Sequence, residues 1–281
     1  MGKKVLGIIV LCCLAGVVLE AQPVSAAFSV SPTRQVAFAP GNLQYCAATD
    51  SWRFAAHQYD IVGKDNGNIS PMNKGWIDLF GWGTSGYNYK FPFMVSTAEE
   101  DYGDGVKDIA GTSYDWGVNK IAGAAGAWRT LTHDEWVYLF FGRPHADKLF
   151  ALAKVNGVNG LVILPDAWEK PAGVSLNVAT TKGFIPETDC YTSDFDNGFQ
   201  CNEYTAVEWA ALEQQGAVFL PAAGYRYGKD VYYAGTRGSY WSATCRDSYY
   251  VYILGFSSGM VHPSIYYTRY YGRAVRLARN L

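Results

Sequence analysis

The C-terminal quarter of the chain, residues 216–281, reads GAVFLPAAGYRYGKDVYYAGTRGSYWSATCRDSYYVYILGFSSGMVHPSIYYTRYYGRAVRLARNL. Four strand-length runs occur in it, at Ala217–Leu220, Tyr240–Thr244, Tyr249–Phe256 and Ala274–Leu277. Turns that contain Gly, Pro, Asp or Ser separate these runs, a pattern typical of antiparallel strands rather than of helices. We therefore predict an antiparallel β-meander here, and an α+β fold once the helices described below are added.

Tyrosine is concentrated in this segment, because twelve of the 21 tyrosines lie between Tyr225 and Tyr271. A tyrosine combines a large rigid ring with a hydroxyl group, and binding surfaces are rich in it for that reason. Aromatic side chains also suit strands through packing alone. Adjacent residues such as Tyr266 and Tyr267, however, point to opposite faces of a strand. Some of the rings are therefore expected to face solvent or a partner.

We predict that this segment carries ligand binding. The strand Tyr250–Phe256 is expected to direct Tyr252, Leu254 and Phe256 to the core, and the residues between them to the other face. If the predicted rings prove not to bind, the aromatic loops around Trp76–Tyr89 are the alternative surface. The predicted binding residues are Tyr232, Tyr233, Arg246, Asp247, Tyr249, Tyr250, His262, Tyr266 and Tyr267.

The first 26 residues have the features of a signal peptide. Lys3 and Lys4 form a basic start, Val5–Leu19 is an apolar run too short to span a membrane, and Val24–Ala26 fits a cleavage site of small residues. We expect the mature protein to be exported and to reach the cell surface, the outer membrane or the medium.

Removal of the signal leaves residues 27–281, which we expect to form one domain, with a β- and loop-rich part at 27–127 and a core at 128–281. Lipid attachment at Cys12 or Cys13 is a less favoured alternative, because neither follows a small residue. No other segment is long and apolar enough to cross a membrane.

The formal net charge of −2 hides an asymmetry along the chain. From Arg226 to the C-terminus eight Lys and Arg residues face two Asp, whereas Glu99–Asp115 contains six acidic residues and one Lys. Export makes nucleic acid an unsuitable partner for the basic end. An anionic glycan or an acidic protein surface is the partner that this charge favours.

Four cysteines remain in the mature chain, and four allow three disulfide connectivities. Cys190 and Cys201 flank a short polar loop, so we predict a disulfide between them. Cys46 and Cys245 are then left as a second pair or as two free thiols. No two cysteines have the spacing of a zinc motif.

Two capping boxes predict the two helices. Thr132 and Glu135 form the first, followed by an apolar run that ends at Gly142, and Thr205 and Glu208 form the second. In such a box the hydroxyl and the carboxylate bond reciprocally to the first backbone N–H groups of the helix.

Several motifs together resemble a known family. The motifs are WRTLTHDEWVYLF, GLVILPDAW, EWAALEQQGAVFLPAAGYRYG, GSYWSAT and YGRAVRLA, in this order over residues 128–281. They resemble exported bacterial surface proteins with a C-type-lectin-like fold, in the branch related to the formylglycine-generating enzyme. Some relatives are variable proteins of diversity-generating retroelements. The resemblance implies that the first and last strands pair, which places Val36–Phe38 beside Val275–Leu277, and that loops and final strands carry the binding surface.

Catalytic motifs are weak in this sequence. Gly255–Gly259 matches G-x-S-x-G, but Pro263 follows too soon for the helix that a nucleophile elbow needs, so a hairpin turn is predicted. The formylglycine-generating enzyme uses two close cysteines, whereas Cys245 has no close second cysteine. The loops Asp101–Gly105 and Asp194–Gly198 offer oxygen ligands for calcium, but ordinary turns explain them better.

We therefore expect no enzymatic activity and no cofactor, apart from the weak calcium alternative. The predicted function is an adhesin-like or lectin-like protein that presents a Tyr- and Arg-rich face to a glycan or a protein. A secreted enzyme on a formylglycine-generating-enzyme-like fold and a structural or pilus-associated subunit are the alternatives.

Overall fold

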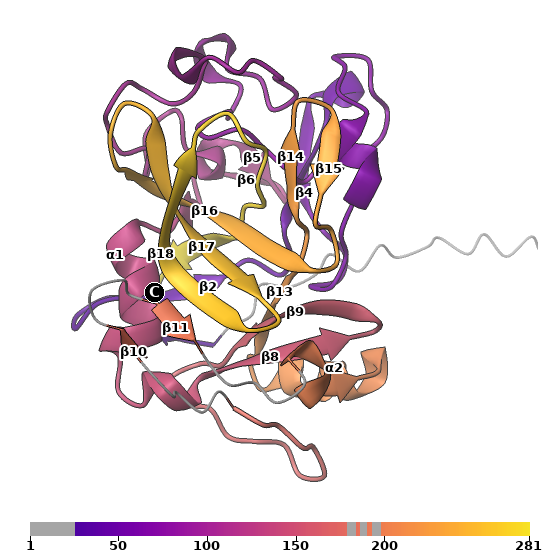
Figure 1. Cartoon of the computed structure of the whole chain (residues 1–281), viewed down its shortest axis with the longest axis vertical. Coiled ribbons are helices and arrows are strands. Elements are labelled where there is room, and N and C mark those ends of the chain that lie inside the picture. Colours follow the sequence, from indigo (N-terminus) through magenta and orange to yellow (C-terminus); the bar gives the residue numbers. More distant parts are fainter. Residues whose placement is uncertain (1–25, 179–183, 186–189, 193–197) are drawn as a thin grey trace, which may run out of the picture.

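The computed structural model describes residues 26–178, 184–185, 190–192 and 198–281, with the side chains of 184–185 and 190–192 left outside the description. Apart from Ala26, the predicted signal peptide lies outside the described residues. Within them the fold is a mixed α+β arrangement of mostly antiparallel sheets and two α-helices (Figure 1). The predicted α+β class is confirmed at this level.

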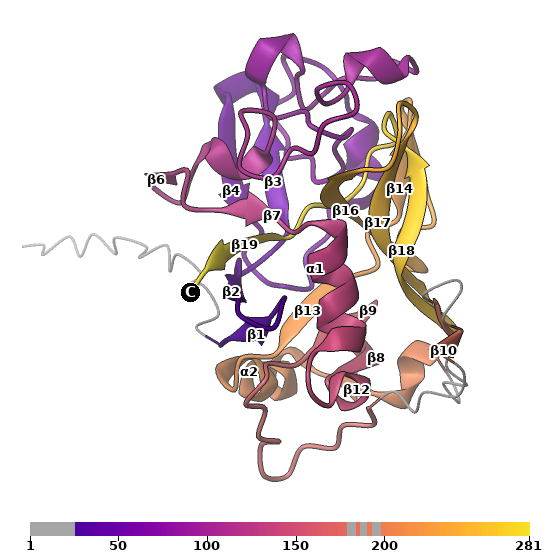
Figure 2. The same ribbon diagram turned by 90° about the vertical axis from the view of Figure 1, so that its left-hand side faces the viewer.

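The two ends of the described chain pair with each other, as expected. Strand β2 (Gln35–Phe38) lies antiparallel to β19 (Leu277–Asn280), with Phe38 opposite Ala278. The backbone N–H of Leu43 donates to the carbonyl oxygen of Val275 at 3.0 Å, which extends this contact beyond the strands. Figure 2 shows β19 between β2 and β7 (Arg129–Thr130).

The central sheet has the order β10-β11-β18-β17-β16. It consists of β10 (Phe184–Ile185), β11 (Cys190–Thr192), β16 (Arg237–Cys245), β17 (Tyr250–Ser257) and β18 (Met260–Thr268). A tight turn joins β17 to β18, so the G-x-S-x-G motif is a hairpin and not a nucleophile elbow, as predicted.

Both faces of this sheet are largely buried at its centre. Leu254 and Phe256 pack into one apolar cluster with Trp136 of the first helix. Val251 and Ile253 pack on the other side, into a second cluster that the N-terminal half of the chain provides. The predicted alternation along β17 is therefore correct for Leu254 and Phe256. Tyr252, which was also predicted to face the core, is only half-buried and stacks on His133. The second face covers another core instead of solvent over most of its length.

Helix α1 (His133–Val137) and helix α2 (Ala206–Gln214) begin at the predicted capping boxes. In α1 the Thr132 hydroxyl accepts from the Glu135 N–H at 3.3 Å, and the Glu135 carboxylate accepts from the Thr132 N–H at 2.9 Å. A π-helical turn, Tyr138–Gly142, continues α1 and ends at the predicted glycine. Helix α1 packs against β16, β17 and β18, and so places its first residues beside the tyrosine-rich strands (Figure 2).

The remaining sheets complete the frame on both sides of the central one. Strands β8 and β9 form a hairpin that carries β13 on one side and β12 on the other. The hairpin β14–β15 carries the first tyrosines of the C-terminal segment (Figure 1). The strands not yet given are β1 (Phe28–Ser29), β3 (Leu43–Cys46), β4 (Ser51–Phe54), β5 (Lys120–Ile121), β6 (Ala124–Ala125), β7 (Arg129–Thr130), β8 (Phe150–Val155), β9 (Val158–Ile163), β12 (Glu203–Tyr204), β13 (Val218–Pro221), β14 (Tyr225–Tyr227) and β15 (Asp230–Tyr232).

Candidate binding surface

The tyrosines of the C-terminal strands form two patches instead of one face. Tyr266 lies opposite Tyr252 in the β17–β18 ladder, whereas its neighbour Tyr267 lies opposite Val251. Because successive side chains of a strand point to opposite faces, these two adjacent rings belong to different sides of the sheet. Their exposed fractions are nearly equal, 44% for Tyr266 and 42% for Tyr267.

The helix-side patch lies on the α1 face of the sheet. It consists of Arg246, Tyr249, Tyr250, Tyr252 and Tyr266. The Arg246 guanidinium lies 3.4 Å from the Tyr266 ring centroid, which is a cation–π contact. The Tyr266 ring in turn contacts the Tyr250 ring at 5.5 Å, edge to face, and the Tyr252 ring at 6.4 Å.

Asp247 shapes the turn that leads into this patch. Its carboxylate accepts the N–H groups of Tyr249 and Tyr250, both at 2.8 Å. Desolvation raises the pKa of Asp247, but these two N–H donors and the nearby Arg246 and Arg269 outweigh it and hold the pKa below its usual value. Asp247 therefore acts as a turn former that orients both rings, and its carboxylate is already occupied by backbone donors.

The hairpin-side patch lies on the opposite side, where β14 and β15 meet the end of β18. Seven tyrosines from three separate segments connect there through ring contacts of 5.1–6.4 Å. They are Tyr225, Tyr227, Tyr232, Tyr233, Tyr267, Tyr270 and Tyr271. Arg237 covers the Tyr233 ring at 4.2 Å. The patch thus offers a continuous aromatic surface with an exposed arginine at its border.

Arg273 lies beneath this patch and is only 2% exposed. Its guanidinium carbon is 4.3 Å from the Tyr267 ring centroid, 5.4 Å from that of Tyr271 and 5.5 Å from that of Tyr225. Burial lowers the pKa of Arg273 to about 10, while the three tyrosines raise it. The side chain therefore keeps its positive charge at neutral pH.

The tyrosine hydroxyls of the hairpin-side patch have no partner within the described part of the chain. Four of the rings are substantially exposed, namely Tyr227, Tyr232, Tyr233 and Tyr267 at 41–48%. Each hydroxyl can donate one hydrogen bond and accept others. These groups are thus available to a polar ligand without breaking any contact of the fold.

The structure divides the predicted binding residues between the two patches. Tyr232, Tyr233 and Tyr267 lie in the hairpin-side patch, and the remaining tyrosines with Arg246 and Asp247 lie in or beside the helix-side patch. His262 belongs to neither, because it lies opposite Gly255, near the hairpin end of β17 and β18. The prediction missed Tyr225, Tyr227, Tyr252, Tyr270, Tyr271, Arg237, Arg273 and His133.

His133 connects α1 to the helix-side patch. Its ring stacks on Tyr252 with centroids 4.0 Å apart, and its Nε2 lies 2.8 Å from the Ser264 Oγ. Its Nδ1 lies 3.0 Å from a carboxylate oxygen of Asp134, which completes a hydroxyl–imidazole–carboxylate chain. The Asp134 side chain is 97% exposed, so solvent competes with it for the imidazole.

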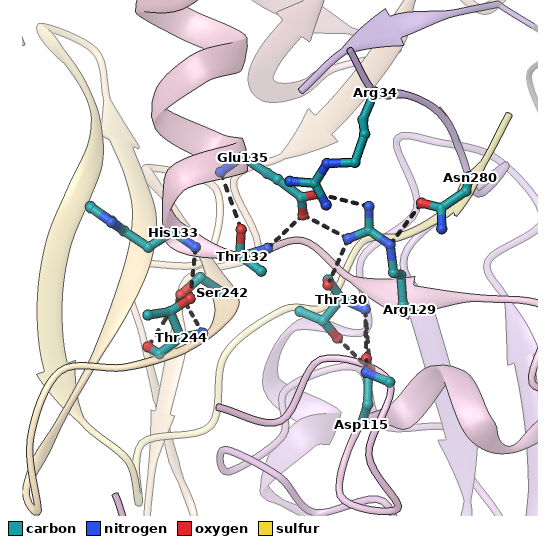
Figure 3. A network of polar contacts seen from close by, with 11 residues as sticks. Arg34, Asp115, Arg129, Thr130, Thr132, His133, Glu135, Ser242, Thr244 and Asn280 are labelled. Atoms are coloured by element: carbon teal, nitrogen blue, oxygen red, sulfur yellow. Dashed lines mark hydrogen bonds and ion pairs between the residues drawn. The ribbon is translucent and has the colours of Figure 1, made fainter. Parts of the chain in front are cut away.

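A buried polar network holds the start of α1 in place (Figure 3). Glu135 is fully buried and accepts two hydrogen bonds from Arg129 in a bidentate pair, at 2.6 and 2.8 Å. It also forms an ion pair with the more exposed Arg34 at 3.2 Å. Below it, the Asp115 carboxylate accepts from the backbone and the hydroxyl of Thr130. Burial raises the pKa of Asp115, while these donors lower it. This network is occupied by its own partners and serves as a support.

The cysteines do not form a reactive site in the described residues. Burial raises the pKa of the Cys245 thiol, and Arg269, whose Nη2 lies 3.0 Å from the sulfur, offsets this only in part. A thiol with a raised pKa is a poor nucleophile at neutral pH. Cys46 and Cys201 have no disulfide partner among the described side chains. The side chain of Cys190 lies outside the described residues, so the disulfide between them stays a prediction.

The described residues contain no group of three or more His, Cys, Asp or Glu side chains that could hold a metal ion. Of the two calcium loops considered, Asp101–Gly105 has Asp104 paired with Lys107 at 3.0 Å, and residues 194–197 of the other lie outside the description. No helix in the described part of the chain is long and apolar enough to span a bilayer.

Comparison with known proteins gives one finding for the region that carries both patches. A family model described as a domain of unknown function (DUF8237) matches residues 200–278. No curated protein and no solved structure matches the chain. The matched residues are similar to that family, and its description names no activity or ligand.

Proposed function

We propose that the chain is an exported, non-catalytic binding protein of the adhesin or lectin type, built on a C-type-lectin-like frame. The observation that carries this proposal is the hairpin-side patch, where seven connected tyrosines keep their hydroxyl groups free of partners in the described chain. Exposed aromatic rings with an arginine beside them are the usual anchors of binding surfaces.

The hairpin-side patch is favoured over the helix-side patch because it connects more tyrosine rings. It gathers rings from β14, β15, the end of β18 and the segment that follows, whereas the helix-side patch gathers rings from β17, β18 and the turn before them. Each patch has an arginine stacked on a tyrosine ring, Arg246 on Tyr266 and Arg237 on Tyr233. The carboxylate of the helix-side patch, Asp247, is already occupied by backbone N–H groups.

Screening the mature protein on glycan and protein arrays tests the proposal, with two matched triple variants. Tyr232→Phe, Tyr233→Phe and Tyr267→Phe together remove three free hydroxyls but keep the rings, so the fold is retained and ligand hydrogen bonds of about 0.5–1.5 kcal/mol each are lost. The control variant is Tyr249→Phe, Tyr250→Phe and Tyr266→Phe. Loss of array binding in the first variant alone is expected. Equal binding by both variants would refute the assignment of the face.

A second candidate is a secreted serine hydrolase, favoured by the Ser264–His133–Asp134 chain alone. In such a site Ser264 would attack an ester carbonyl while His133 takes its proton. A fluorophosphonate probe separates the two functions, because it labels only an activated serine. Labelling of Ser264 that His133→Ala abolishes would replace the binding proposal with this one. Absence of labelling on the intact mature protein is the result we expect.

A further inference from the structure

The most unusual group of the hairpin-side patch is its buried cation. The described residues contain five arginines that are almost fully buried, and four of them are well supplied with acceptors. Arg143 contacts the Asp166 carboxylate at 3.2 Å, and Arg276 donates to the carbonyl oxygens of Ala39 and Phe219. The remaining two, Arg226 and Arg269, also donate to backbone carbonyls.

Arg273 differs from these four. Its Nη1 donates to the Ser239 hydroxyl, and among the described residues it makes no hydrogen bond to a backbone carbonyl and no ion pair with a carboxylate. Its Nε has no hydrogen-bond partner there, which is also true of Arg226 and Arg269. Its main neighbours are aromatic rings, those of Trp241 and of three tyrosines of the patch. Ring faces attract a cation but carry no opposite charge. A buried charge without a counter-ion extends its field to the surface above it more strongly than a solvated charge does.

The surface above Arg273 adds to this field. Arg237 lies over the Tyr233 ring and is exposed, and Lys229 lies in the turn of the β14–β15 hairpin beside Asp230. These charges sum to a positive patch within a chain whose net charge is −2. The free tyrosine hydroxyls on the same surface are hydrogen-bond donors.

We propose that the hairpin-side patch binds a saccharide that carries a carboxylate or sulfate group. A carboxylate or sulfate accepts hydrogen bonds without donating any, and so it complements the tyrosine hydroxyls and the exposed Arg237. The rings offer flat apolar faces for the sugar. The anionic group of the sugar would provide the negative charge that the buried Arg273 lacks, and would be attracted by the field of that arginine. This inference rests on the proposed binding function and names its ligand class.

The test is the binding of four oligosaccharides to the mature protein by isothermal titration at low and moderate salt. They are an oligogalacturonate, its neutral methyl ester, a sulfated cello-oligosaccharide and the unsulfated form. The two charged sugars separate a carboxylate from a sulfate ligand. At least one of them is expected to bind about tenfold or more tightly than its neutral form, with an affinity that falls as salt rises.

Three variants assign this effect to the patch. Arg273→Met and Arg237→Gln each remove one positive charge, and each is expected to lower the affinity for the charged sugar by about tenfold. Lys148→Gln removes an exposed charge elsewhere and is expected to leave the affinity unchanged. If Arg273→Met does not fold, Arg237→Gln and the methyl-ester comparison decide alone.

The outcomes also separate this inference from the proposed function. If charged and neutral sugars bind with equal affinity, and the triple Tyr→Phe variant of the hairpin-side patch abolishes this binding, the proposal of an anionic ligand is overturned. The patch would then remain a binding surface. No binding of any of the four sugars would overturn the saccharide class. If Lys148→Gln lowers the affinity as much as Arg237→Gln does, the effect depends on the overall charge of the protein and not on the patch. This result would also overturn the inference.

Discussion

The buried carboxylate Asp78 makes stability depend on pH, and the substitution Asp78→Asn tests this. Asp78 is fully buried beside the turn Gly63–Gly67, where its oxygens accept from the Val62 N–H at 3.0 Å and from the Asn66 amide at 2.7 Å. Burial raises its pKa from 3.8 to about 6, and the two hydrogen bonds lower it only in part. The turn lies against β15, with Gly67 so close to Lys229 that a Cβ would be 2.4 Å from its carbonyl oxygen. Asp78 thereby supports the hairpin-side patch.

The direction of the effect follows from proton binding. Between about pH 4 and 6 the folded protein keeps a proton on Asp78 that the unfolded chain has already released. The stability that this proton contributes is complete below the unfolded pKa, and it is lost as the pH rises through the folded pKa. The shift of roughly two pKa units corresponds to about 3 kcal/mol of unfolding free energy.

Urea denaturation of the wild type and of Asp78→Asn at pH 4, 5, 6 and 7 measures this quantity. The free energy of unfolding of the wild type, relative to the variant, is expected to fall by about 2.5 kcal/mol from pH 4 to pH 7, because pH 4 lies just above the unfolded pKa. Asp65→Asn removes an exposed carboxylate from the same turn and serves as the control. A difference that stays constant with pH, or rises with it, would refute the argument from burial.

Two further predictions concern the frame. Glu135→Gln is expected to lower the free energy of unfolding by about 2–4 kcal/mol, because Arg129 is only 15% exposed and loses its charged partner. Glu208→Gln in the exposed capping box of α2 is expected to cost much less than Glu135→Gln. Equal losses of unfolding free energy for the two variants in chemical denaturation would contradict the role of burial. In the exported protein, mass spectrometry without reduction is expected to find Cys190 linked to Cys201, and alkylation of both thiols would rule the link out.

The sequence predicted well what depends on local chemistry. The capping boxes at Thr132 and Thr205 place both helices, because a box specifies its own hydrogen bonds within four residues. The alternation along β17 assigned Leu254 and Phe256 to one face correctly, since the period of a strand is fixed by its backbone.

The division of the tyrosines into two patches could not be predicted in the same way. It depends on which strands pair and on what covers each face, and both arise from contacts between distant segments. Tyr225 meets Tyr271 only because the backbone of Arg226 pairs with that of Gly272. The adjacent pair of Tyr266 and Tyr267 did signal two faces, and applying period two to β18 as well as to β17 would have separated them.

The most direct test of the central claim compares Tyr266→Ala with Tyr267→Ala. These neighbours have almost the same exposed fraction but lie in different patches. The measurement is the affinity of each variant for the ligand that array screening of the mature protein selects. Tyr267→Ala is expected to weaken binding by about tenfold or more, and Tyr266→Ala is expected to leave it nearly unchanged. The reverse order, or equal losses, would contradict the account that the hairpin-side patch is the binding surface.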